Sequence, residues 1–218
     1  MERKPVIIDP MQFPVSVQEI LNGAAVYDSS CSSAARVWFI RKDGGYYLKT
    51  APSGSLRQEA LMTGFFHGKG LGAEVLLYEQ ADADWLLTRA VPGEDCIHKQ
   101  YLDDPVRLCD TLAILLRQLH ETDFAGCPVP DRTGEYIAAV AENHRLKKWD
   151  DSLFPDNWGY RSADEAWAVV EEFSGELKND VLIHGDYCLP NVILDNWNFS
   201  GFIDLGLRRI RYFLMKHQ

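Results

Sequence analysis

The stretch that decides the fold is VLIHGDYCLPNVILDNWNFSGFIDLG, residues 181–206. Asp186 follows His184-Gly185 and precedes Asn191 by five positions, on a short loop between two apolar runs that have the pattern of strands. The second run ends in Asp204-Leu205-Gly206, an aspartate at a strand end before a glycine turn. Two carboxylates and a carboxamide are hard oxygen ligands, so their convergence predicts a Mg²⁺ site. An ordinary hairpin with polar ends would explain H-x-D alone, but explains the combination poorly.

The spacing H-x-D-x-x-x-x-N is that of a kinase catalytic loop. In such a loop the aspartate accepts or orients the proton of the attacking hydroxyl, while oxygen ligands hold the metal ion. We therefore take Asp186 as the candidate catalytic residue, and Asn191 and Asp204 as the candidate metal ligands.

The segments HGDYCLPN and SGFIDLG together resemble the aminoglycoside 3'-phosphotransferase (kanamycin kinase) family, closely here and more loosely elsewhere. The resemblance implies an α+β, two-lobed, protein-kinase-like fold. A small antiparallel-sheet lobe would occupy residues 1–90, and a mostly helical lobe with the catalytic loop residues 91–218. It further implies ATP and Mg²⁺ as cofactors, and phosphoryl transfer to a hydroxyl of an aminoglycoside antibiotic, which confers resistance.

The first 50 residues predict a helix at Val15–Leu21 and strands at residues 24–27, 36–40 and 46–50, with a turn at residues 42–45. Residues 29–35 form a loop of small side chains between the first two strands. In kinase-like folds such a loop covers the triphosphate, because small side chains let backbone N–H groups approach the phosphate oxygens. Ser32 and Ser33 are accordingly the candidate phosphate contacts.

The resemblance assigns five further residues to the nucleotide site. Lys49, on the predicted return strand, matches the lysine that pairs with the α- and β-phosphates, and Glu59, near the start of the next helix, would be its partner. The strand at residues 85–90 leads into the segment that would read the adenine edge through its backbone, so the expected contacts there are Thr88, Ala90 and Val91.

Helical periodicity begins near residue 103 and predicts a buried central helix up to residue 120. A second helix is expected at residues 136–146 and a third at residues 162–177, where Ser162 and Glu165 fit a capping box. Between the last two lies an acidic, aromatic stretch. The resemblance makes it a binding segment for antibiotic amino groups, with Asp150, Asp151 and Asp156 as candidates, whereas a solvated loop is the alternative.

Composition narrows the function classes. The net charge of -10 disfavours nucleic-acid binding and suits a cationic partner. The N-terminus has no apolar signal region, and no apolar run reaches the roughly 18 residues of a membrane span, so we expect a cytoplasmic protein without membrane contact. Five cysteines without a C-x-x-C pair suggest neither a disulfide framework nor a zinc site. The oligomeric state is not indicated.

The pattern breaks after Gly206, where the resembled family continues with several more helices. Residues 207–218 instead read LRRIRYFLMKHQ, a short basic segment. This change predicts a truncation or frameshift, an incomplete second lobe and an incomplete antibiotic pocket. Two alternatives therefore stay open: a kinase for choline, a homoserine-like amino acid or a sugar, and a catalytically dead module that still binds nucleotide.

Overall fold

A computed structural model of the chain describes residues 3–31, 33–149 and 159–206. The chain separates into two compact units. The described part of unit 1 takes in residues up to 120 and again from 183, and that of unit 2 the residues between them. The boundary between residues 90 and 91 that the sequence suggested for two lobes stays a prediction.

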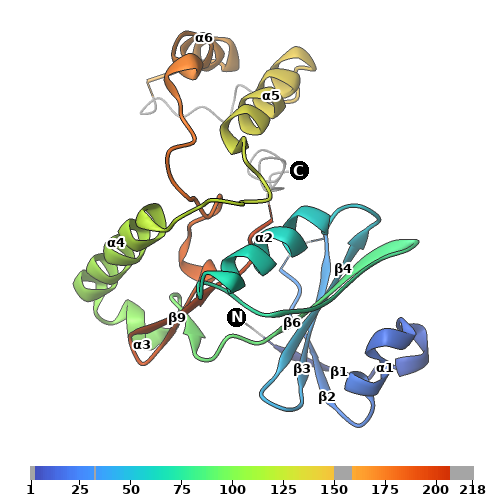
Figure 1. Cartoon of the computed structure of the whole chain (residues 1–218). Helices are drawn as coiled ribbons and strands as arrows, with labels where there is room; N and C mark the ends of the chain where they lie inside the picture. Colours follow the sequence, from blue (N-terminus) through green and yellow to red (C-terminus); the bar gives the residue numbers. More distant parts are fainter. Residues whose placement is uncertain (1–2, 32, 150–158, 207–218) are drawn as a thin grey trace. The chain divides into compact units, whose positions relative to one another are not determined.

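Unit 1 contains a six-stranded sheet in which all neighbouring strands are antiparallel (Figure 1). In spatial order its strands are β1 (Lys4–Val6), β2 (Ala25–Asp28), β3 (Arg36–Arg41), β4 (Tyr46–Pro52), β6 (Ala83–Arg89) and β5 (Val75–Gln80). The strands predicted at residues 24–27, 36–40 and 46–50 are confirmed to within two residues. In β3 the buried residues do not alternate, because Trp38, Phe39 and Ile40 are buried in succession and both faces of the strand are covered.

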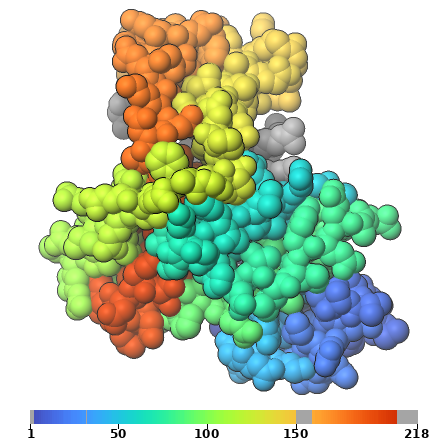
Figure 2. Space-filling view, in the orientation of Figure 1, coloured from blue at the N-terminus to red at the C-terminus, as the bar shows by residue number. Residues whose placement is uncertain are grey.

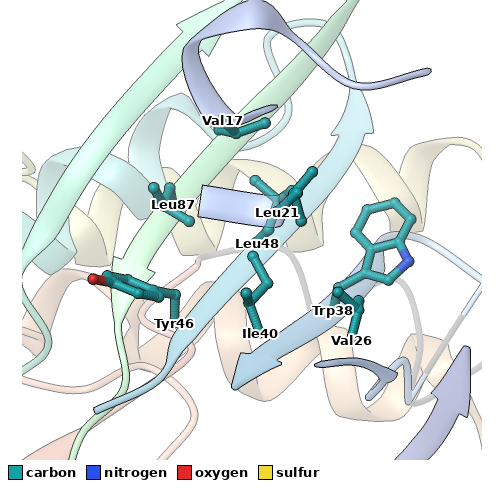
Figure 3. Close-up of a cluster of buried hydrophobic side chains, with 8 residues drawn as sticks. All are labelled: Val17, Leu21, Val26, Trp38, Ile40, Tyr46, Leu48 and Leu87. Carbon is teal, nitrogen blue, oxygen red and sulfur yellow. The ribbon is translucent and has the colours of Figure 1, made fainter. Parts of the chain in front are cut away.

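Two helices cover opposite faces of this sheet. Helix α1 (Val15–Leu21), as predicted, buries Val17 and Leu21 in a cluster with Ile40, Leu48 and Leu87 (Figure 3). Helix α2 (Arg57–Gly68) contributes Ala60 to a second cluster that contains Leu86. Adjacent strand residues point to opposite faces, so Leu86 and Leu87 show that the two helices lie on different sides.

A smaller sheet follows in the same unit, in the order β7 (Glu94–Asp95), β8 (Val192–Asp195) and β9 (Asn198–Phe202). Phe202 donates its N–H to the carbonyl of Leu71, 2.8 Å away, and so joins β9 to the turn after α2. Helix α3 (Lys99–Leu102) brings Tyr101 under β8, where its hydroxyl donates to the carbonyl of Leu194 at 2.7 Å. The candidate catalytic loop is thereby fixed directly before β8.

Two expectations need correction. The apolar run at residues 181–183 forms no strand in the described chain, and both Val181 and Ile183 are 41% exposed. Helix α4 (Pro105–Glu121) is confirmed as a helix, but it is not buried all round, because Val106 and Ile114 are 72% and 57% exposed. Leu108, Leu115 and Leu119 bury a single face, which is what helical spacing encodes.

Unit 2 contains the helices α5 (Arg132–Arg145) and α6 (Ala163–Phe173). The Ser162 side chain accepts the N–H of Glu165 at 3.2 Å, as the capping box predicted, but the Glu165 carboxylate reaches the N–H of Arg161 instead of returning to Ser162. None of the helices in the described ranges is long and apolar enough to cross a bilayer.

Candidate active site

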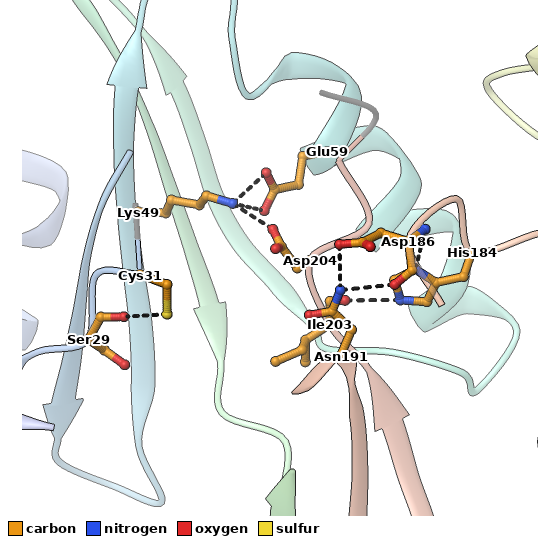
Figure 4. Close-up of polar contacts among 9 residues, drawn as sticks. All are labelled: Ser29, Cys31, Lys49, Glu59, His184, Asp186, Asn191, Ile203 and Asp204. Atoms are coloured by element: carbon orange, nitrogen blue, oxygen red, sulfur yellow. Dashed lines mark hydrogen bonds and ion pairs between the residues drawn. The ribbon is translucent and has the colours of Figure 1, made fainter. Parts of the chain in front are cut away.

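Lys49 lies between two carboxylates in unit 1 (Figure 4). Its Nζ is 2.8 Å from both oxygens of Glu59 and 2.9 Å from Oδ1 of Asp204. The exposed fractions of the three side chains are 19%, 11% and 28%. Burial lowers the pKa of Lys49, but the charges of Glu59 and Asp204 outweigh it, so the pKa stands above its usual value. The ammonium group therefore stays charged and anchored.

Asp186 is held by the side chains on either side of it in the motif. Asn191 donates its Nδ2 to the backbone oxygen and to Oδ2 of Asp186, both at 3.0 Å (Figure 4). The N–H of Asp186 donates to Nδ1 of His184 at 3.2 Å. Since Nδ1 accepts, Nε2 of His184 carries the hydrogen and donates to the carbonyl of Ile203 at 3.0 Å. His184 thus links the catalytic loop to the strand that leads to Asp204.

Aromatic packing fixes the loop further. Tyr187 donates its hydroxyl to the carbonyl of Leu112 in α4 at 2.7 Å. Burial raises the pKa of Tyr187 to about 12, with a smaller contribution from Cys96, so the phenol remains a donor. The buried His184 ring also lies edge-on to Phe66 and Phe202, with centroid distances of 6.4 and 5.5 Å. The catalytic loop is therefore anchored by side chains of α2 and β9 and by the backbone of α4.

The glycine of the D-L-G segment lies close to Glu59. A Cβ on Gly206 would stand 2.9 Å from Oε2 of Glu59, so a side chain there would displace the partner of Lys49. Asp204 has a φ of 59°, a left-handed conformation that aspartate tolerates better than most residues. The N–H of Ile203 donates to the carbonyl of Asn191 at 3.1 Å and keeps the two predicted metal-binding segments adjacent.

The donor set around this point fits Mg²⁺. Both amide N–H contacts of Asn191 go to Asp186, which directs the amide oxygen away from that residue. That oxygen and the carboxylate of Asp204 are the ligand type that Mg²⁺ prefers. The described residues contain no cluster of three or more His, Cys, Asp or Glu side chains suited to a metal ion, so the fit depends on the amide oxygen and on oxygens from elsewhere.

A small pocket in unit 1, of about 30 Å³, is lined by both apolar and charged side chains. Its walls include Tyr47, Val91, Ile193 and Ile203, and Arg3 donates to the hydroxyl of Tyr47 at 2.8 Å. Of the three predicted base contacts only Val91 lines it. Thr88 belongs to β6, where it pairs with Tyr47 and Val75 in the sheet, and the N–H of Ala90 donates to the carbonyl of Gly45 at 3.0 Å.

The predicted phosphate loop is partly described. Asp28 accepts the N–H of Ser30 at 2.9 Å, the hydroxyl of Ser30 accepts the N–H of Val37 at 2.9 Å, and Cys31 contacts the carbonyl of Ser29 (Figure 4). These contacts give the loop a defined start. Ser33 is exposed. Outside the described residues lie Ser32, the predicted substrate contacts Asp150, Asp151 and Asp156, and residues 207–218.

Sequence reasoning missed three contributions to the site. It gave no role to His184, although a histidine two residues before a candidate catalytic aspartate was a usable signal. It did not foresee the Lys49–Asp204 ion pair or the pocket residues Arg3 and Tyr47, for which the sequence carried no local signal.

Residues 29–213 match the family model described as "Phosphotransferase enzyme family". The chain is 44% identical over 203 residues to a "Probable aminoglycoside 3'-phosphotransferase" of Lactococcus lactis, an alignment that covers 93% of this chain and 77% of the relative. It is also similar to the solved structure of an aminoglycoside phosphotransferase from Streptomyces rimosus, with 25% identity, a TM-score of 0.68, and coverage of 92% of this chain and 77% of the other.

The same Streptomyces rimosus enzyme has been solved in complex with ADP and streptomycin. That structure matches with 26% identity and a TM-score of 0.62, and the alignment covers 78% of this chain and 68% of the other. The fold expectation of a protein-kinase-like structure is thereby confirmed. The match spans most of the chain and includes the lysine, the catalytic loop and the D-L-G segment, and the chain belongs to the phosphotransferase enzyme family that includes the aminoglycoside phosphotransferases.

Proposed function

We propose that this protein transfers the γ-phosphoryl group of ATP to a hydroxyl group of an aminoglycoside antibiotic. The observation that carries the proposal is the pairing of two arrangements in unit 1. Asp186 is oriented by Asn191 and His184, and Lys49 is anchored by Glu59 beside Asp204. An oriented carboxylate and an anchored cation are what phosphoryl transfer requires of a protein, because the reaction depends mainly on positioning and charge stabilisation.

Each residue has a distinct part in the proposed reaction. Asp186 accepts or orients the proton of the attacking hydroxyl. Lys49 binds phosphate oxygens while Glu59 keeps its ammonium group in place, and Asn191 and Asp204 are the residues that would hold Mg²⁺. When bound, Mg²⁺ supplies positive charge that neutralises the phosphate oxygens as charge shifts in the transition state. Binding the nucleotide would exchange the Lys49–Asp204 contact for phosphate and metal contacts.

The small pocket is the proposed contact for one edge of the base, because its volume of about 30 Å³ is too small for a whole purine. Apolar walls from Val91, Ile193 and Ile203 and the ring of Tyr47 suit a flat heterocycle. Val91 fits the predicted base contact directly, whereas Thr88 and Ala90 would act by shaping the strand end. In the loop after β2, Ser32 and Ser33 remain the proposed phosphate contacts.

Three observations support an aminoglycoside as acceptor. The relative of Lactococcus lactis is named a probable aminoglycoside 3'-phosphotransferase, and the related enzyme of Streptomyces rimosus was solved with streptomycin. The net charge of -10 also suits polycationic substrates. Asp150, Asp151 and Asp156 are the proposed contacts for the substrate's amino groups. We further infer a cytoplasmic enzyme, since the proposed reaction consumes ATP.

The test is ATP-dependent phosphorylation of kanamycin, followed by mass spectrometry of the product. Asp186→Asn, which keeps the shape but loses the proton acceptor, should lower the turnover number by about 10²-fold or more. Asp110→Asn is the matched control, since Asp110 is exposed on α4. If Asp186→Asn turned over as fast as the parent protein, the role given to Asp186 would be wrong.

An acceptor panel separates the proposal from its competitors. Kanamycin, neomycin and streptomycin would be compared with choline, homoserine and simple sugars at a fixed ATP concentration. A preference for one of the last three classes would move the function to another small-molecule kinase. Saturable ATP binding without transfer to any acceptor would instead favour a module that only binds nucleotide.

A further inference from the structure

A second cavity lies in unit 1, between the segment after β1 and strand β3. Its volume is about 400 Å³, within the usual range of small-molecule sites. Its lining combines the apolar Ile8, Phe13 and Trp38 with the charged Asp9 and Arg36, and shares no residue with the candidate active site. The N-terminal segment that forms one wall lies at the surface (Figure 2, blue).

Trp38 presents a buried donor that lacks an acceptor. The residue is 4% exposed, and within the described ranges its Nε1 is the one buried side-chain nitrogen or oxygen without a hydrogen-bond partner. In Figure 3 the indole nitrogen lies on the side of the ring away from Leu21, Ile40 and Leu48. Buried donors in native proteins are nearly always satisfied, so an orphan N–H beside a cavity points to a group that occupies the cavity.

The indole cannot easily turn to find another acceptor. Phe13 packs edge-on to it at a centroid distance of 5.1 Å, and Trp85 stacks on it at 6.1 Å. Phe13 also contacts Trp85 at 5.7 Å, so the three rings form one packed group. The N–H of Trp38 is therefore fixed in its direction before any ligand arrives.

A cation stands beside this donor. The guanidinium carbon of Arg36 lies 5.0 Å from the Trp38 ring centroid, and the Arg36 side chain is 61% exposed. Its one ion pair in the described chain is long, with Asp28 Oδ2 4.0 Å from its Nε, and the same Asp28 carboxylate also accepts the N–H of Ser30. Asp9, which lines the cavity as well, accepts the N–H of Met11 at 3.0 Å. Arg36 thus has donors left for an anion.

We propose that this cavity binds a small organic carboxylate with an apolar body. One carboxylate oxygen accepts the Trp38 N–H, the carboxylate pairs with Arg36, and the apolar part lies against Ile8 and Phe13. A neutral carbonyl compound would satisfy the donor but not the cation, and a cationic amine would satisfy neither. The site is independent of the proposed phosphoryl transfer, so either can fail without the other.

The experiment follows the indole N–H signals of the ¹⁵N-labelled full chain by NMR. The probes are phenylacetate, the neutral phenylacetamide and the cationic phenethylamine. The Trp38 signal is identified by its loss in Trp38→Phe or, should that variant not fold, by its through-space contacts to Phe13. We expect phenylacetate to shift this signal saturably, phenylacetamide to bind about tenfold more weakly, and phenethylamine to leave the signal unmoved.

Two substitutions sharpen the result. Arg36→Gln should weaken phenylacetate binding about tenfold and remove its advantage over phenylacetamide, whereas Arg89→Gln, an exposed arginine on β6, should change neither. Equal shifts from all three probes would mean nonspecific contact with an apolar surface. No saturable shift with phenylacetate would mean that water alone satisfies the indole. Either outcome overturns the proposal.

Discussion

Lys49 forms largely buried ion pairs that connect distant parts of unit 1. Its ammonium group contacts Glu59 from α2 and Asp204 from the segment after β9, so one side chain connects three elements of unit 1. Removing one partner from a largely buried ionic group is costly, because the remaining charges have lost both water and their counter-ion. Lys49 should therefore affect folding as well as nucleotide binding.

We expect Lys49→Met to lower the free energy of unfolding by about 2–3 kcal/mol at neutral pH. The pKa of Lys49 is raised in the folded protein, so its stabilisation is fully present below its ordinary value of 10.5 and is lost as the pH rises through the higher folded value. Urea unfolding of both proteins should thus give a constant difference between pH 7 and 9 that shrinks above pH 10.5.

Lys99→Met is the matched control for this change. Lys99 pairs with Asp103 in α3, but the lysine side chain is 81% exposed, and exposed ion pairs contribute little. An equal loss of stability in both variants would show that the central position of Lys49 carries no special weight.

At the scale of elements, the junction of β7 with β8 depends on one glycine. Gly93 has a φ of 104°, and a Cβ there would overlap the carbonyl oxygen of Leu194 and stand 2.6 Å from its carbon. Both the backbone conformation and the close approach exclude a side chain. Because β8 follows the catalytic loop directly, a shift of β8 would move Asn191.

We expect Gly93→Ala to lower the free energy of unfolding by about 3 kcal/mol or more, from backbone strain and steric overlap together. Gly44→Ala is the control, because Gly44 also has a positive φ, of 89°, but a Cβ there meets nothing within 4 Å. That variant should lose only about 1 kcal/mol. Thermal unfolding of the two proteins measures the difference, and equal losses would mean that the contact with Leu194 adjusts freely.

The elements that the sequence predicted well are those with a local signal. Short runs of β-branched and aromatic residues bounded by turn residues located β2, β3 and β4, although β3 buries Trp38, Phe39 and Ile40 in succession and so does not alternate. The same logic failed at residues 181–183, where an apolar run has no strand to pair with in the described chain. Helical spacing located α4 but overstated its burial, since a period shows which face is apolar and not how much of the helix is covered.

The candidate site also contains contacts that the sequence predicted and contacts that it did not. Glu59 was predictable as the partner of Lys49 from the order of motifs, whereas the contact of Lys49 with Asp204 joins residues 155 positions apart and depends on tertiary structure. The predicted base contacts Thr88 and Ala90 rested on backbone groups, which leave no side-chain signature. The N–H of Ala90 proved to be used by Gly45 within the sheet region.

For the whole molecule, the two units differ in how their helices are buried. The cluster around α1 contains fully buried side chains such as Val17 and Leu48, and α2 itself buries Phe66 completely. In unit 2, helix α5 has no buried residue and α6 buries only Ala163 within the described chain. Local structure opens most readily where few apolar contacts must break, and opening lets amide hydrogens exchange with water. The amide hydrogens of α5 and α6 should therefore exchange faster than those of the sheet of unit 1 even without ligand.

MgATP should widen this difference. The proposed nucleotide and metal residues, including Lys49, Val91, Asp186 and Asp204, all belong to unit 1. A ligand at a hundredfold excess over its Kd stabilises the form that binds it by about 2.7 kcal/mol, which slows exchange through unfolding of that form roughly 100-fold. Hydrogen exchange measured by mass spectrometry should therefore be slower in β3, β4 and the segment 184–206, with little change in α5 and α6.

Two variants serve as controls for this pattern of protection. Asp186→Asn should keep the pattern, because the aspartate acts on the acceptor hydroxyl, while Lys49→Met should lose it. Equal protection of α5 and α6 would mean that nucleotide binding stabilises the chain as one cooperative body, and the expectation that the two units open independently would then be wrong.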